Sequence, residues 1–263
     1  MKRTKRGAFA LLLALCVTLG LLPALTPAAS AGEASEPSDG PSAAGYELYV
    51  GGVQITSDNL TVNGGSGTAT YDPAERTLTL NNYSYTGSGT NIGDKGGGIE
   101  YHGDGDLRIA LVGSNSIVKS GDSSPDESFG IYFNVDSGTL STLTISGEGS
   151  LDISFEDTSE DTSSGISKRN GIFCDPGAFV MESGTVTAAG GYAVESVGIY
   201  AQDGITFNGG TFTGIGKPTA DDGNGGSGGI YTNAAITING GTVTAQATNG
   251  DTIAIQKNLA NNR

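Results

Sequence analysis

The chain has 263 residues, 44 of them Gly, and its 28 Asp and Glu outnumber its 13 Lys and Arg, for a formal net charge of −15. Such an acidic surface repels nucleic acid and anionic membranes, which excludes nucleic acid as a partner. Basic partners and divalent cations suit it better.

The first 31 residues have the layout of a secretory signal peptide. Basic residues from Lys2 to Arg6 precede an apolar run at 8–22, and the small residues Ala29-Ser30-Ala31 follow. This order predicts export and cleavage after Ala31. An uncleaved membrane anchor is the alternative. We therefore expect a secreted or cell-surface protein, without a membrane span after signal cleavage, and a monomer.

Residues 32–45 are rich in Ser, Pro, Ala, Gly and Glu, which indicates a flexible linker. Residues 46–77 predict an N-terminal cap. Tyr46 to Ile55 alternates in polarity, and the stretch Thr68 to Leu80 contains the turn Asp72-Pro73-Ala74-Glu75, a hairpin signal. We expect this cap to cover the open strand edge at the start of the β-structure formed by the residues after it.

Residues 78–263 repeat one pattern. Its clearest copies are GIFCDPGAFVMESGTVTA at 171–188, GIYAQDGITFNGGTFTG at 198–214 and GGIYTNAAITINGGTVTA at 228–245. Each copy has short runs of period-two alternation separated by Gly-rich corners, which is typical of stacked strands in a solenoid. The sequence therefore predicts an all-β fold, a right-handed parallel β-helix of about five to six irregular coils with an N-terminal β-hairpin cap.

The coils keep their apolar pattern but vary in length. From Leu78, the equivalent positions are predicted to be Leu107, Leu143, Phe179, Ile205 and Ile236, with spacings of 29, 36, 36, 26 and 31 residues. The extra residues fall at 88–97, 119–129, 155–170 and 215–227, several of them just before a Gly-Ile run. We expect these insertions to gather along one edge of the solenoid. Cys174, at a position that is Ala or Thr in other coils, is interpreted as a small core residue.

One outward position of the Gly-Ile strand is aromatic in four successive coils. After Glu100, it holds Tyr132, Phe173, Tyr200 and Tyr231. Stacked coils would align these rings about 4.8 Å apart in an exposed stripe, which is a candidate carbohydrate-binding site. The alternative is a ring ladder that stabilises the sheet, or rings that the loops cover.

Acidic loops offer oxygen ligands of the kind that Ca²⁺ accepts. The candidate metal ligands are Asp104, Asp106, Asp221, Asp222 and Asn224, and further acidic groups are Asp122 with Asp126 and Glu127, and Glu156-Asp157 with Glu160-Asp161. None has the twelve-residue spacing of a calcium-binding loop. A solvated acidic surface is the alternative.

His102 and the paired Thr residues are two further candidate features. His102, the only His, lies in Tyr-His-Gly-Asp-Gly-Asp and could act as a base, but a single His beside a turn is more often a surface residue. The Thr pairs 185/187, 211/213 and 242/244 would form hydroxyl and methyl ladders like those of ice-binding faces, although strand propensity explains them too. No catalytic residue is predicted.

The units Gly-Ile-Tyr followed by Ile-Thr-Ile-Asn-Gly-Gly-Thr-Val-Thr resemble the repeats of secreted right-handed parallel β-helix surface proteins of Gram-positive bacteria, and are similar to a carbohydrate-binding β-helix family among them. The resemblance covers about Leu78 to Ala247. It implies binding of an extracellular polysaccharide or cell-wall glycan, often with calcium. Asp221-Asp222-Gly223-Asn224 is a loose match to the family's acidic pattern.

The predicted function is therefore an extracellular, non-catalytic, polysaccharide-binding module. The alternative is a cell-surface adhesion or spacer protein that binds a protein partner. A polysaccharide lyase or hydrolase ranks third, because neither the Asp-Asp and Gly-His-Gly motifs nor the Arg-x-Pro-x-x-Arg motif of such β-helix enzymes is present.

Overall fold

The computed structural model describes residues 44–120, 127–135, 140–156, 167–217, 227–248 and 254–257. They belong to one compact unit, Ala43–Arg263, and the predicted signal peptide lies outside them. The predicted linker lies outside them too, except for residues 44 and 45, since the first strand begins at Gly45. Throughout the described residues the regular structure is strand, as predicted, and no helix is long and apolar enough to cross a membrane.

Three sheets make up the fold. Sheet A contains β8 (Lys95–Tyr101), β11 (Glu127–Phe133), β14 (Lys168–Cys174), β17 (Val197–Ala201), β20 (Gly228–Thr232) and β23 (Ile255–Lys257). Sheet B contains β5 (Thr77–Asn81), β9 (Leu107–Val112), β12 (Thr142–Gly147), β15 (Ala178–Met181), β18 (Ile205–Phe207) and β21 (Ile236–Ile238). Sheet C contains β6 (Ser84–Gly87), β10 (Ser114–Lys119), β13 (Ser150–Phe155), β16 (Thr185–Ala189), β19 (Thr211–Gly216) and β22 (Thr242–Ala247). All these strands pair in parallel within their sheets.

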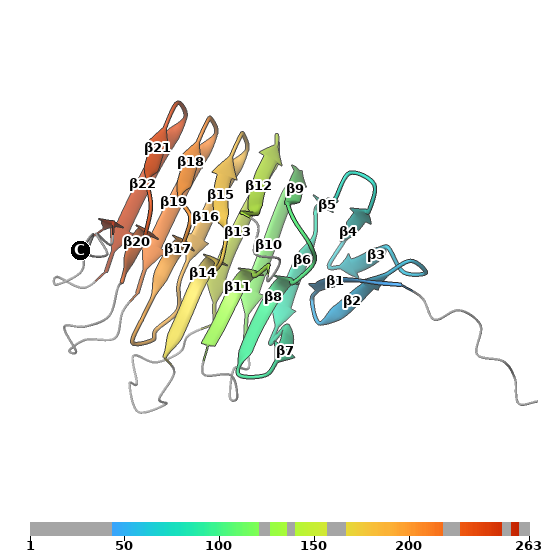
Figure 1. Ribbon diagram of the computed structural model, residues 1–263. Coiled ribbons are helices and arrows are strands. Elements are labelled where there is room, and N and C mark those ends of the chain that lie inside the picture. The colour runs from blue at the N-terminus through green and yellow to red at the C-terminus, as the bar shows by residue number, and fades with distance from the viewer. Residues whose placement is uncertain are drawn as a thin grey trace, which may run out of the picture. The chain divides into compact units, whose positions relative to one another are not determined.

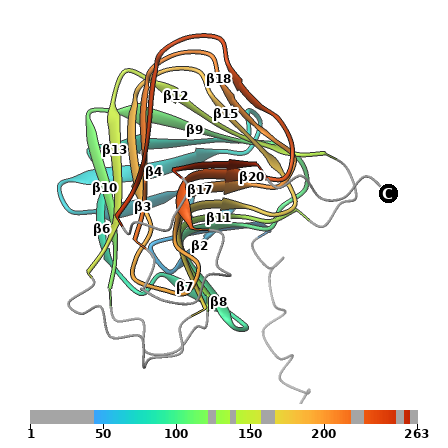
Figure 2. The same cartoon turned by 90° about the vertical axis from the view of Figure 1, so that its left-hand side faces the viewer.

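The chain visits sheets A, B and C in turn, so each circuit adds one strand to every sheet (Figure 1). Seen along the stack, successive circuits follow nearly the same outline (Figure 2). Five coils in the described residues contribute to all three sheets, from β8–β9–β10 to β20–β21–β22, which makes about four turns between the first and the last. The β-solenoid is thus confirmed, and the predicted five to six coils is slightly high as a count of turns. The right-handed winding stays a prediction.

The predicted register holds in sheet B from the second strand onward. Leu107 pairs with Leu143, and the series continues through Phe179, Ile205 and Ile236. The first member was wrong: Leu78 lies opposite Ile109, two residues further along β9 than predicted. A shift of two residues keeps a side chain on the same face, so Leu78 still points into the core.

The Gly of each Gly-Ile pair lets sheet A approach sheet C closely. A Cβ on Gly130 would lie 2.1 Å from the side chain of Ile153, and one on Gly198 would lie 2.4 Å from the backbone nitrogen of Ile215. Any larger residue would push the two sheets apart. The repeated Gly is therefore a packing requirement of the corner where each coil closes.

An N-terminal cap covers the first coil, as predicted, and consists of two hairpins. One is β1 (Gly45–Val50) with β2 (Val53–Thr56), and β1 pairs antiparallel with β8. The other is β3 (Thr61–Gly64) with β4 (Gly67–Asp72), and β4 pairs antiparallel with β5. A short strand, β7 (Thr90–Ile92), also pairs with β8. The cap therefore closes sheets A and B at this end with antiparallel strands.

The predicted insertions all connect sheet C to sheet A. They lie between β6 and β8, β10 and β11, β13 and β14, and β19 and β20, so they share one corner of the solenoid. Cys174 occupies the predicted core position between Phe133 and Ala201, and it is fully buried. Burial raises the pKa of its thiol, which keeps it protonated and unreactive.

Candidate functional site

The outer face of sheet A carries the aromatic residues that the sequence singled out. Tyr132 pairs with Phe173, Phe173 with Tyr200, and Tyr200 with Tyr231, so the predicted alignment is correct. Successive ring centroids are 6.0, 4.9 and 5.2 Å apart. We call these four residues the aromatic row.

The predicted exposure of these rings is wrong. Tyr132 and Phe173 are each 3% exposed and Tyr200 is 8% exposed, while Tyr231 at the last coil is partly exposed. Phe129, whose ring stacks at 4.6 Å on Phe173, joins them in a second apolar cluster outside the main core. These rings therefore form the ladder that the sequence offered as the alternative, and only Tyr231 retains accessible ring surface.

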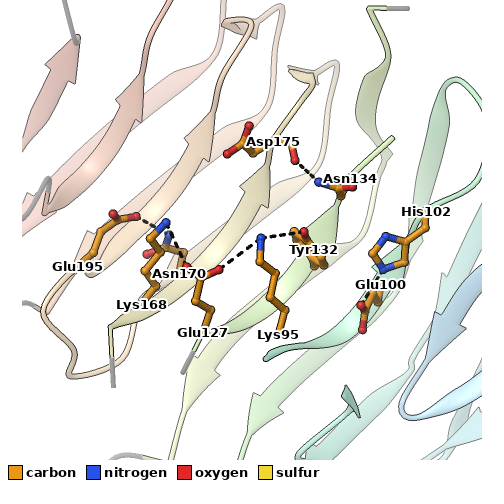
Figure 3. Close-up of polar contacts among 10 residues, drawn as sticks. All are labelled: Lys95, Glu100, His102, Glu127, Tyr132, Asn134, Lys168, Asn170, Asp175 and Glu195. Atoms are coloured by element: carbon orange, nitrogen blue, oxygen red, sulfur yellow. Dashed lines mark hydrogen bonds and ion pairs between the residues drawn. The ribbon is translucent and has the colours of Figure 1, made fainter. Parts of the chain in front are cut away.

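A row of alternating charges runs beside the aromatic row, which we call the charge row: Lys95, Glu127, Lys168 and Glu195 (Figure 3). The Glu127 carboxylate lies 3.4 Å from the Lys95 ammonium and 3.3 Å from that of Lys168. Glu127, a candidate metal ligand in the sequence, is thus held between two lysines. Because the pairs are partly exposed, each contributes at most about 1 kcal/mol to stability.

The two lysines also cover the rings. The Lys95 ammonium donates to the Tyr132 hydroxyl at 3.3 Å and lies 5.4 Å from the ring centroid, and the Lys168 ammonium lies 5.5 Å from the centroid of Phe173. These contacts are cation–π interactions. Burial alone would lower the pKa of Lys95, but the Tyr132 hydrogen bond and Glu127 outweigh it and the pKa is raised. Lys95 therefore stays charged on this face.

A polar row borders the aromatic row on its other side, at the carboxyl ends of the strands: His102, Asn134, Asp175, Gln202 and Asn233. The Asn134 amide donates to the backbone carbonyl of Asp175 (Figure 3), and the Asn233 amide donates to the Tyr200 hydroxyl at 2.9 Å. Asn233 is exposed and the other four are partly exposed. This row therefore offers donors and acceptors to solvent once per coil.

Two carboxyl groups on this face have raised pKa values. Burial raises the pKa of Asp175 and of Glu195, and Lys168 opposes the rise in both cases. Glu195 also accepts a hydrogen bond at 3.1 Å from the buried amide of Asn170, whose carbonyl oxygen accepts the Val197 N–H. At a pH near the ordinary carboxyl pKa, these two side chains are therefore neutral more often than free carboxyl groups are.

His102 pairs with a buried carboxylate. Its Nε2 lies 2.7 Å from Oε1 of Glu100, which is fully buried, and its ring meets that of Tyr132 edge-on at 5.3 Å (Figure 3). The other oxygen of Glu100, Oε2, is buried without a hydrogen-bond partner. A carboxylate orients the imidazole here, as one does in many catalytic pairs.

Two of the predicted metal ligands, Asp104 and Asp106, belong to the described residues. Asp106 accepts the Thr142 N–H at 2.8 Å, and the backbone carbonyl of Asp104 accepts the Tyr101 hydroxyl at 3.3 Å. The described residues contain no group of three or more His, Cys, Asp and Glu side chains able to hold a metal ion. Asp221, Asp222 and Asn224 lie outside the described residues. Calcium binding therefore stays a prediction.

The Thr pairs lie on the outer face of sheet C. Thr185, Thr211 and Thr242 are in register and exposed, and Thr187, Thr213 and Thr244 form a second, partly exposed row. The ladders are thus real, and they cover three of the coils. Ordinary strand pairing accounts for them.

The charge row was missed in the sequence, although it left a signal there. Lys95, Glu127, Lys168 and Glu195 each lie four residues before the Ile of the Gly-Ile pair. Phe129 was missed for another reason, because its equivalents are Gly97 and Asn170 and so it does not repeat. A charged residue at a fixed spacing before each repeated Ile is the pattern that predicts the charge row.

Comparison with known proteins identified no relative of this chain. No protein-family model, curated protein sequence or solved structure matches the chain. The resemblance to secreted β-helix surface proteins stays a prediction, and the function has to be argued from the residues themselves.

Proposed function

We propose that the protein is an extracellular, non-catalytic module that binds a polysaccharide along the outer face of sheet A. The observation that carries the proposal is the polar row, which repeats hydrogen-bonding side chains once per coil beside the aromatic row. A polysaccharide also repeats its hydroxyl groups at a fixed interval. A linear array of donors and acceptors suits a linear polymer.

The aromatic row supports this function in a different way from the one first expected. Rings that are 3–8% exposed cannot receive a sugar face, but their stacking holds the neighbouring strands rigidly in register. The pre-ordered side chains then lose little entropy on binding. Tyr231 is the ring left for direct contact, and Asn233 next to it is exposed.

The test is affinity electrophoresis of residues 32–263 in native gels that contain single plant or bacterial polysaccharides, with calcium and with a chelator. Retardation by one glycan is expected, and Tyr231→Ala should weaken it about tenfold, which corresponds to about 1.4 kcal/mol. Asn233→Ala should act in the same direction. Thr206→Ala, on the outer face of sheet B, is the matched control and should leave retardation unchanged.

Failure of every glycan to retard a folded chain would contradict the proposal. It would favour the alternative, an adhesion or spacer protein that binds a protein partner, for which the buried ring ladder supplies stiffness. The hydrolase or lyase alternative would appear as reducing ends or unsaturated products released from the glycan, and His102→Ala should then abolish their release. Calcium dependence would point to the acidic loops.

A further inference from the structure

The first coil departs from the aromatic row. At the position that holds a ring in the next four coils, β8 has Glu100, which lies between Tyr49 of β1 and Tyr132 of β11 in the sheet. The Glu100 side chain is fully buried. A buried carboxylate has to be compensated by a partner, whereas a ring at this position would simply extend the ladder. A departure of this kind from the repeated pattern is expected at a functional site.

His102 is the partner that compensates the Glu100 carboxylate. Its Nε2 lies 2.7 Å from Oε1 of Glu100, and its backbone N–H donates to the carbonyl of Glu47 at 2.8 Å. In the described part of the chain, the carboxylate has no other hydrogen-bond partner, because Oε2 is buried and unpaired. The ring of His102 also packs against that of Tyr132 (Figure 3). Backbone, carboxylate and neighbouring ring thus hold His102 in one orientation.

The hydrogen bond to Glu100 determines which ring nitrogen of His102 carries the proton. An ionised carboxylate can only accept, so Nε2 donates, and in a neutral imidazole the other nitrogen, Nδ1, is then an acceptor. Nδ1 has no hydrogen-bond partner among the described residues, and it is not a buried atom. The side chain as a whole is 24% exposed. The outer face of sheet A therefore presents an oriented acceptor next to the cap.

The two lysines of this face are already engaged. Lys95 and Lys168 both contact Glu127, and each ammonium also lies over a ring. A carboxylate on a ligand would have to break these ion pairs, and at the polar row it would meet the lone pair of Nδ1 and the side chain of Asp175. A hydroxyl group can donate to Nδ1 and leave the ion pairs intact.

We propose that His102 binds the polysaccharide by accepting a hydrogen bond from a sugar hydroxyl at Nδ1, that Glu100 is its positioning residue, and that the face selects uncharged glycans. This inference rests on the proposed function and adds to it the role of one atom and the class of glycan. The next member of the polar row, Asn134, carries an amide that can accept or donate, so the same polymer can continue along the row.

Nitrogen-15 NMR of residues 32–263 tests the protonation of His102 without a ligand. His102 is the only His, so its ring signals are identified directly. At about pH 8 the wild-type chain should show a protonated Nε2 and an unprotonated Nδ1. Glu100→Gln should show a mixture of the two neutral forms, because an amide can donate as well as accept. A protonated Nδ1 in the wild-type chain, or an unchanged spectrum in Glu100→Gln, would overturn the inference whatever the glycans do.

Native affinity gels test the binding with two matched pairs of glycans: hydroxyethyl cellulose with carboxymethyl cellulose, and galactomannan with polygalacturonate. An uncharged member should bind about tenfold more tightly than its anionic counterpart. The Glu100→Gln, His102→Ala double variant removes the ring without leaving an unpaired buried charge, and it should weaken binding about fivefold. Thr206→Ala is again the control and should bind as the wild type does.

The outcomes separate this inference from the function on which it rests. Tighter binding of an anionic glycan, or unchanged binding by the folded double variant, would overturn the role of His102 and leave polysaccharide binding standing. Absence of retardation by every glycan would contradict the proposed function and the role of His102 with it. The NMR spectra would still show whether Glu100 fixes the ring.

Discussion

The two ends of the solenoid share one sequence pattern and differ in what covers them. Leu78 in the first strand and Ile238 in the last belong to one column of inward positions, which runs through Ile109, Ile145, Met181 and Phe207. Leu78 is fully buried under the cap, and Ile238 is 54% exposed. Burial in this fold is therefore a property of neighbouring coils, and the residue alone does not determine it.

This difference has an energetic meaning. In a repeat protein each unit is stabilised mainly by its interfaces with the units on either side. The first coil has two such interfaces, since the hairpins act as a neighbour, whereas the last coil of the described residues has one full interface. The same apolar side chain should thus contribute less to stability at the C-terminal end.

The largest expected effect is a difference between truncations in the two end strands. Leu78→Ala should lower the free energy of unfolding by about 2–5 kcal/mol, because it leaves a cavity in a covered core. Ile238→Ala should cost less than about 1 kcal/mol, since half of that side chain already contacts water. Urea denaturation of the two variants measures both values. Equal losses would show that the last described coil is as well covered as the first.

A smaller difference should appear in the aromatic row. Phe173→Ala removes a ring packed between Phe129 and Tyr200 and should cost about 3 kcal/mol. Tyr231→Ala removes a partly exposed ring with one aromatic neighbour, so about 1 kcal/mol is expected. Thermal unfolding followed by circular dichroism compares the two. A Tyr231→Ala loss as large as that of Phe173→Ala would mean that the ladder does not weaken toward its end.

The smallest expected effect concerns pH and originates in the middle of the stack. The pKa values of Asp175 and Glu195 are raised by burial, so the native state holds their protons more tightly than the unfolded state does. Stability from this source is complete below the ordinary carboxyl pKa, about 4, and is lost as the pH rises through the raised values. The unfolding temperature should therefore increase from pH 7 toward pH 4.5. In the Asp175→Asn, Glu195→Gln double variant that increase should shrink, and an unchanged slope would assign it to other groups.

Much of the fold could be predicted because the pattern that builds it is local. Alternation identified the strands, and the repeated Gly-Ile pair aligned Ile131, Ile172, Ile199 and Ile230 in sheet A as the structure does. Leu78 was misaligned because its strand reads Leu-Thr-Leu, and either Leu satisfies the same alternation. A period of two cannot distinguish shifts of two residues.

The candidate site could be predicted less well, because period and register say which way a side chain points and not what lies above it. The aromatic row was placed correctly on the outer face, yet Phe129 and the two lysines that help to bury it come from other positions of the strands. The pairing of His102 with Glu100 was likewise not predicted, because alternation places residues two apart on one face without showing that their side chains meet. Burial outside the main core needs three-dimensional coordinates.

The charge row disfavours pairing between the wrong coils. Coils whose apolar residues are interchangeable could pair out of order during folding, because Ile131 would fit beside Ile199 as well as beside Ile172. Skipping one coil would bring Lys95 against Lys168, or Glu127 against Glu195, and two like charges would meet in each case. Each pairing error that skips a single coil therefore places like charges side by side. The four charges thus disfavour the nearest pairing errors, which the uniform apolar core cannot do by itself.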